Sequence, residues 1–147
     1  MEELLELRRY IEQGRTADAL FIVDELTDMA KRDKINRMTS FMVLLMMHII
    51  KKHVEKRTTP SWERTIRNAT LDIRKTNQRD DAGGFYMNES QLRDALNEYY
   101  RYALMDAASE AFGGQYSHKQ LAPMLDAEVI KQETLHYILH GIPDDDE

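Results

Sequence analysis

Several residue types are scarce in this 147-residue chain, and each shortage excludes something. There is no cysteine, which excludes disulfides, thiolate metal sites and a cysteine nucleophile and fits a reducing cytoplasm. Proline occurs three times and glycine six times, and five of the glycines lie where helices are expected to end or loop. The longest apolar run, residues 41–50, is about half of the ~20 residues that span a bilayer, so we expect no membrane span. The first residues are acidic where a secretion signal is basic, so we expect no signal peptide.

Charge of both signs is abundant and unevenly distributed. Charged residues make up 31% and apolar residues 42%, which is typical of one folded domain at this length. Residues 1–50 have seven basic and nine acidic side chains (−2), residues 51–79 have nine and three (+6), and residues 80–147 have four and 14 (−10). The sum is the net charge of −6. This asymmetry indicates partners or self-association rather than a particular fold.

Helical periodicity runs through nearly the whole chain, and no segment alternates as a strand does. A short first helix ends at Gly14. The second helix has an apolar stripe that we expect to be buried. Asp33 can cap a third helix running to about residue 56, whose middle is apolar almost all round, as in a central helix. The stripe of the second helix consists of Ala19, Ile22, Val23, Leu26, Met29 and Ala30.

The later helices have clear start signals. Thr59 and Pro60 suit the cap and first position of a basic helix. Asn88 opens a capping box before an alanine-rich helix that runs to residue 112, and Ser117 and Asp126 can cap two more.

We therefore predict an all-α, single-domain bundle of six or seven helices around a central apolar helix at about residues 34–56. The domain would cover residues 1–143, and residues 144–147 would be an acidic tail.

Two short patterns near the middle of the chain suggest a family. They are Leu44-Leu45-x-x-His48-x-x-Lys51 and Ser61-Trp62-x-x-x-Ile66. With them, residues 4–79 resemble the bacterial domain-of-unknown-function family number 29, helical proteins abundant in cyanobacteria and also found in proteobacteria. Residues 80–84 stand where that family usually has a Pro-Ser-Leu segment, so we expect a divergent C-terminal half. The resemblance implies an α-helical fold and brings no established activity with it.

His48, Lys51 and Trp62 are the candidate catalytic residues. His48 and Lys51 lie three apart on one helix face, and the following corner can bring the indole of Trp62 against them. A buried histidine beside a cation and an indole could bind an anion or act as a general acid–base. Alternatively, His48 and Trp62 hydrogen-bond to backbone and fasten two helices at a buried corner.

Glu133, His136 and His140 are helical neighbours with a spacing suitable for metal ligands. A di-iron bundle needs two Glu-x-x-His elements and two further glutamates, and a zinc site needs one or two more ligands. Exposed side chains on a terminal helix are the alternative interpretation. No phosphate loop, dinucleotide-binding motif or hydrolase motif occurs, so we expect no cofactor.

The basic segment supplies candidate binding residues for phosphates. They are Lys51, Lys52, Arg57, Arg64, Arg67 and Arg74. The acidic net charge, and the lack of a helix-turn-helix or stacking-aromatic pattern, favour a solvated face or one that pairs with an acidic surface.

The leading hypothesis is a non-catalytic protein-interaction or accessory module in the cytoplasm. Nucleic-acid binding through the basic helix is the alternative, and an enzyme or metal-binding bundle is a further one. The partner could also be a second copy, with Tyr99, Tyr100 and Tyr102 of the helix at residues 89–112 at the centre of a homodimer. In a monomer, the acidic half would pack over the basic helix instead.

Overall fold

The computed structural model describes residues 2–79 and 83–143, and this part of the chain is helical and contains no strand. Its α-helices are α1 (Glu2–Glu12), α2 (Thr16–Glu55), α3 (Pro60–Asn77), α4 (Glu89–Glu110), α5 (His118–Leu121) and α6 (Ala127–His140). The 3₁₀ segments η1 (Ala111–Gly114) and η2 (Ala122–Met124) flank α5. The predicted all-α bundle of six or seven helices is confirmed. The predicted acidic tail, residues 144–147, lies outside the described residues.

The predicted helix boundary at Asp33 is wrong. One continuous helix, α2, occupies the region where we expected two, so the central helix does not begin at residue 34. Residues 31–34 contain neither glycine nor proline. An aspartate in a helix interior costs at most about 0.7 kcal/mol, and interrupting the helix would leave several backbone groups without partners. The helix therefore continues through the capping residue.

The chain forms two compact units, residues 1–34 and residues 35–147, and α2 contributes to both. In the first unit only Ala19 and Ile22 are buried among the described residues. The expectation of a wholly buried stripe is wrong for the rest, because the 11-residue α1 is too short to cover it. A segment of 34 residues is too small to be stable alone, so the division does not by itself define two domains, and the single domain remains a prediction.

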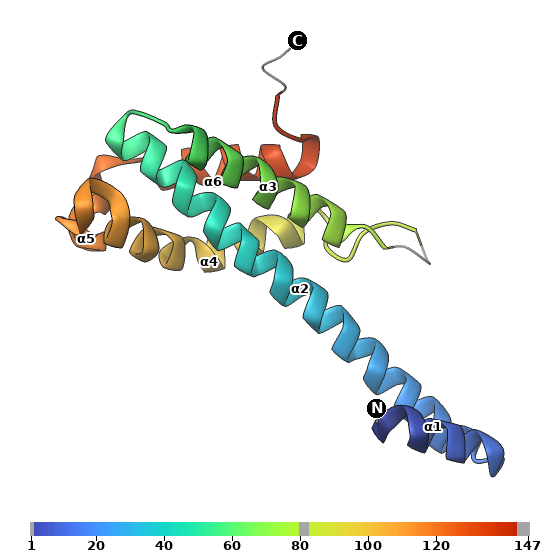
Figure 1. Ribbon diagram of the computed structural model, residues 1–147. Helices are drawn as coiled ribbons and strands as arrows, with labels where there is room; N and C mark the ends of the chain where they lie inside the picture. Colours follow the sequence, from blue (N-terminus) through green and yellow to red (C-terminus); the bar gives the residue numbers. More distant parts are fainter. Residues whose placement is uncertain (1, 80–82, 144–147) are drawn as a thin grey trace. The chain divides into compact units, whose positions relative to one another are not determined.

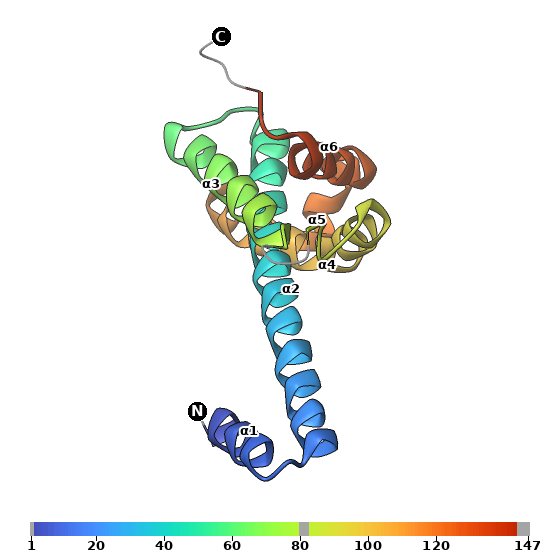
Figure 2. The ribbon, with the colours of Figure 1, turned by 90° about the vertical axis from the view of Figure 1, so that its right-hand side faces the viewer.

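The core of the second unit is centred on the later part of α2. Figures 1 and 2 show α3, α4 and α6 arranged around this part of the helix. Met38, Met42, Leu45 and Met46 are fully enclosed there. A helix that is apolar all round needs neighbours on every side, and the three surrounding helices supply them. The core side chains from those helices include Ile66, Ile73, Leu92, Leu96, Ala103, Ala107, Ile130 and Ile138.

Small residues and side-chain caps shape these helices. Ala103 and Ala107 of α4 are completely buried, as the sequence predicts, and they allow neighbouring helices to approach closely. Asn88 and Ser117 form the predicted reciprocal capping boxes, and Asp126 caps α6 by accepting a hydrogen bond from the N–H of Glu128. None of the described helices is both long enough and apolar enough to cross a membrane.

Two polar atoms in this unit lack a hydrogen-bond partner among the described residues. They are the buried hydroxyls of Thr70, on α3, and of Tyr100, on α4. Burial, with a smaller contribution from the charge of Asp126, raises the pKa of Tyr100 to about 12. The ammonium of Lys131 lies 5.1 Å from the centre of the Tyr100 ring.

We expect Tyr100→Phe to be at least as stable as the wild type, by up to about 1 kcal/mol, because it removes a buried hydroxyl that has no described partner. The pKa of Tyr100 is higher in the folded state than its ordinary value of 10.0, so this group does not lower the free energy of unfolding below about pH 10. As the pH rises towards about 12, the free energy of unfolding falls, because the unfolded chain loses this proton more readily. Tyr100→Phe should therefore lose less stability than the wild type over this range. Urea unfolding at neutral and alkaline pH measures both effects.

Tyr102→Phe is the matched control, because its ring is 44% exposed. A strong destabilisation by Tyr100→Phe at neutral pH, or the same alkaline loss in both variants, would contradict the prediction.

Candidate functional site

The corner between α2 and α3 is built around the indole ring of Trp62. Lys56 adopts a left-handed φ of 55° directly after α2, which turns the chain. The hydroxyl of Thr59 then caps α3 by accepting a hydrogen bond from the N–H of Trp62 at 3.0 Å. Two cations lie against the ring. The ammonium of Lys51 is 4.5 Å, and the guanidinium carbon of Arg57 is 4.6 Å, from its centre.

Lys51 has two partners inside the structure. Only 5% of the residue is exposed, and its Nζ lies 3.0 Å from a carboxylate oxygen of Glu110, at the end of α4. A buried ammonium is costly unless it is paired, and the carboxylate and the indole face together satisfy it. We call Lys51, Trp62 and Glu110 the lysine clasp. Because these residues belong to α2, α3 and α4, the clasp fastens three helices together.

His48 hydrogen-bonds within its own helix. Its Nδ1 lies 3.0 Å from the carbonyl oxygen of Leu44, and since a carbonyl only accepts, Nδ1 carries the proton. Of the three candidate catalytic residues, the structure brings Lys51 and Trp62 into contact, and His48 is buried. These contacts favour the structural interpretation of the corner, and a catalytic role stays a prediction.

Two more of the candidate binding residues are held by internal ion pairs. Lys52 lies 2.7 Å from a carboxylate oxygen of Glu63, and Arg57 lies 3.1 Å from one of Glu55. The hydrogen bond from Lys52, followed by one from the hydroxyl of Thr58, holds the pKa of Glu63 below its usual value. With Lys51 in the clasp, three of the six predicted binding residues therefore have partners within the protein.

Arg64 and Arg67 lie instead on a free surface of α3. Together with Leu71 and Lys75 they recur every three or four residues, so they share one side of the helix, opposite the buried Ile66 side. All four are exposed, and the three cations make no ion pair with any described residue. We call these four residues the outer face of α3. Leu71 was not among the predicted binding residues. Its position seven residues, or about two helical turns, after Arg64 nevertheless places it on the same face of the helix.

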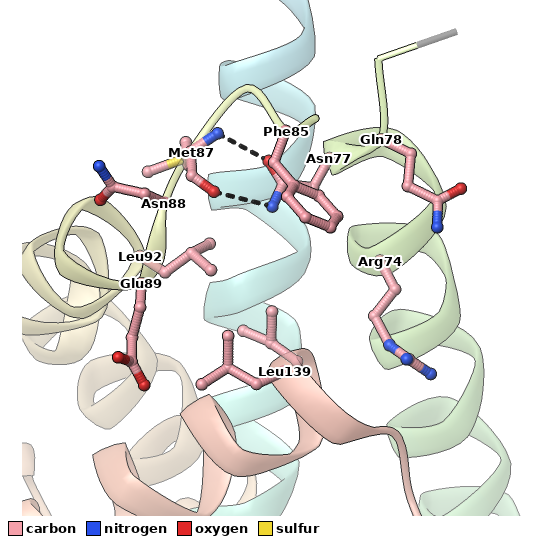
Figure 3. Close-up of a pocket in the computed structure, with 10 residues that line it drawn as sticks. Arg74, Asn77, Gln78, Phe85, Met87, Asn88, Glu89, Leu92 and Leu139 are labelled. Atoms are coloured by element: carbon pink, nitrogen blue, oxygen red, sulfur yellow. Dashed lines mark hydrogen bonds between the residues drawn. The ribbon is translucent and has the colours of Figure 1, made fainter. Parts of the chain in front are cut away.

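Arg74, the last candidate binding residue, lines a cavity of about 300 Å³ between α3, the start of α4 and the end of α6. Figure 3 shows Arg74 and Glu89 on opposite sides of it, with the apolar side chains of Leu92 and Leu139 between them. Arg74 also lies close to Gly141, where the Cβ of any added side chain would come within 2.7 Å of a guanidinium nitrogen. The sequence alone did not predict this cavity, because its walls come from three distant segments.

The wall of the cavity nearest the α3–α4 link is fixed by Asn77. Its side-chain amide donates to the carbonyl of Met87 at 3.0 Å, and its amide oxygen accepts from the N–H of Met87 at 2.8 Å (Figure 3). Both residues are buried, so the two hydrogen bonds are shielded from water.

The candidate metal ligands on α6 have other contacts. One oxygen of Glu133 lies 2.9 Å from Nε2 of His53, and the other accepts from the hydroxyl of Tyr137 at 3.0 Å. The rings of His136 and His140 lie 4.8 Å apart. Within residues 2–79 and 83–143, no group of three or more histidine or acidic side chains is placed to hold a metal ion. The metal site stays a prediction.

The chain matches the family model described as domain of unknown function DUF29 over residues 7–133. The matched range includes the whole lysine clasp and the outer face of α3. It also extends well beyond residue 79, and the divergence of the C-terminal half, like the bacterial origin, remains a prediction. No curated protein and no solved structure matches the chain.

We expect Glu110→Ala to lower the free energy of unfolding by about 1–2 kcal/mol, because it leaves the buried ammonium of Lys51 without a carboxylate. The loss should be smaller than for a fully buried pair, since the Glu110 side chain is 52% exposed. Adding Lys51→Met should restore part of the stability by removing the unpaired charge. Urea unfolding of the wild type, the single variant and the double variant measures these differences.

Glu98→Ala is the control, because Glu98 is an exposed glutamate on α4, and it should have almost no effect. Equal losses of stability at positions 98 and 110 would show that the lysine clasp does not stabilise the fold.

Proposed function

Because the chain belongs to the DUF29 family, whose description assigns no activity, we propose a function from its surface: a non-catalytic interaction module that binds an acidic partner protein. The binding site is the outer face of α3. The observation that carries the proposal is the contrast among the basic side chains of one segment. Lys51, Lys52 and Arg57 make internal ion pairs, whereas Arg64 and Arg67 make none among the described residues, and the charge of Arg67 acts on Glu63 from beyond ion-pair distance.

Unpaired cations in a row on one helix face attract an acidic surface over several ångströms and orient it on approach. The apolar side chain of Leu71, 45% exposed, lies between them. An apolar contact surrounded by charges is the usual composition of a protein interface, in which burial supplies affinity and charges supply orientation.

Two carboxylates on the flanks of this face favour a protein over a nucleic acid. Glu63 lies on one side and Asp72 on the other. Hydrogen bonds from Arg37 to both oxygens of Asp72, at 2.9 and 2.7 Å, hold the pKa of Asp72 below its usual value, so it stays ionised near neutral pH. Such charges repel a continuous phosphate backbone, but a protein partner can place a cation or a gap opposite each. The net charge of −6 acts in the same direction.

The non-catalytic part of the proposal is supported by the clasp. Its ammonium, indole and carboxylate contact one another, which leaves them occupied in holding helices together. His48, the remaining candidate for acid–base chemistry, is hydrogen-bonded through Nδ1.

We expect the double charge reversal Arg64→Glu/Arg67→Glu to weaken partner binding at least about tenfold, because it turns the attraction into repulsion. A tagged wild-type chain first captures the partner from a lysate of the native host. The purified partner is then titrated with each variant, and wild-type affinity should fall as salt is raised.

The control for this experiment is Arg93→Glu/Arg101→Glu, which makes the same change of net charge on the exposed side of α4. Equal binding by the wild type and the α3 variant would contradict the proposal. A random-sequence oligonucleotide is tested in parallel at about 50 mM salt, where phosphate contacts are strong. If it binds the wild type and not the α3 variant, the outer face is a nucleic-acid site instead.

A further inference from the structure

The first unit, residues 1–34, exposes a large amount of apolar surface. In α1, Leu4, Leu5 and Ile11 are each more than half exposed, and this helix buries no residue. In the part of α2 that belongs to this unit, Leu20 and Phe21 are also more than half exposed. A soluble helix normally hides its apolar stripe, so this amount of exposure indicates a surface that something covers.

One side of α2 forms the floor of a groove of about 420 Å³. Ile22, Leu26 and Met29 are its apolar lining residues. The charged side chains around it are Glu3, Glu25, Asp28 and Arg32. An apolar centre within a charged rim is the composition of a protein–protein contact. Helical periodicity predicts all three apolar residues to be buried, whereas Ile22 is buried, Leu26 is half-buried and Met29 is exposed.

We propose that a second copy of the chain covers this groove, so that two first units pair about a two-fold axis into a four-helix arrangement. This inference uses a different surface from the outer face of α3 and does not depend on it. A closed symmetric dimer is the commonest assembly of soluble proteins, and it requires a patch that complements itself. Although three of the four charged side chains around the groove are acidic, Asp28 and Arg32 form one pair of opposite charges that two copies can exchange.

Asp28 and Arg32 show how the patch can complement itself. They lie one turn apart on the same side of α2, and neither makes an ion pair with a described residue. If two α2 segments cross antiparallel near residue 30, Asp28 faces Arg32 of the partner subunit, and the reverse pair forms by symmetry.

The exposed apolar area of this unit sets an upper limit on the interface. Seven large apolar side chains are between 41% and 62% exposed. At roughly 100 Å² each they total roughly 700 Å² per copy, against the ~800 Å² that each partner of a standard interface buries, and those on α2 point in several directions. The members of this set are Leu4, Leu5, Ile11, Leu20, Phe21, Val23 and Met29.

The inference is tested on the full chain by light scattering after gel filtration at micromolar concentration. We expect twice the chain mass for the wild type and a single chain mass for Met29→Glu, because the substitution places a carboxylate in the apolar centre. Met105→Glu, on α4, is the matched control, with 46% exposure against 48% for Met29, and should remain a dimer. A monomeric wild type, or a dimer broken by Met105→Glu and not by Met29→Glu, overturns the inference.

A second variant covers the case in which Met29→Glu fails to fold. The chain has no cysteine, so Met29→Cys introduces a single thiol with little change in size or polarity. A short bismaleimide should link two copies of Met29→Cys and leave Met105→Cys unlinked. Linkage at position 105 and none at position 29 would assign the dimer to α4 and overturn the inference.

Discussion

The need to cover the later part of α2 on every side determines the rest of the second unit. Every side chain from Leu45 to Lys51 is buried, so over about two turns no side of the helix faces water. A single partner helix covers only one side. The chain therefore requires several helices in different directions, and α3, α4 and α6 fill those positions.

Polar groups in this unit are used mainly to hold that arrangement. The lysine clasp, the pair between Arg37 and Asp72 and the pair between His53 and Glu133 each connect α2 to another helix. Such pairs contribute direction more than energy, since partly exposed ion pairs are weak and buried ones are offset by desolvation. They select one packing among those that the apolar surfaces alone would permit.

Features that depend on residues close together in the sequence were predicted correctly. Features that depend on contacts between distant residues were not. Caps at Thr59, Asn88 and Ser117 were correct, because each signal and its result lie within one turn. The cap expected at Asp33 was wrong. An aspartate can start a helix, but no glycine or proline ends the preceding helix there, so the helix continues. The number of unpaired cations in the basic segment, residues 51–79, was equally hard to predict. Lys51 pairs with Glu110, which lies 59 residues further along the chain, and no spacing rule reveals that this glutamate will lie beside a lysine.

The buried alanines of α4 limit which substitutions this protein can accept during evolution. At a contact between large side chains, one residue can shrink while its neighbour grows, and the helices keep their separation. The side chains of Ala103 and Ala107 consist of one methyl group each, and both residues are completely buried, so a larger side chain has no room there. We therefore expect these two positions to vary only between alanine, glycine and serine among related chains, while the methionines of α2 exchange freely with leucine and isoleucine. We therefore expect the spacing between these helices to be kept more strictly than the identity of the side chains that fill the core.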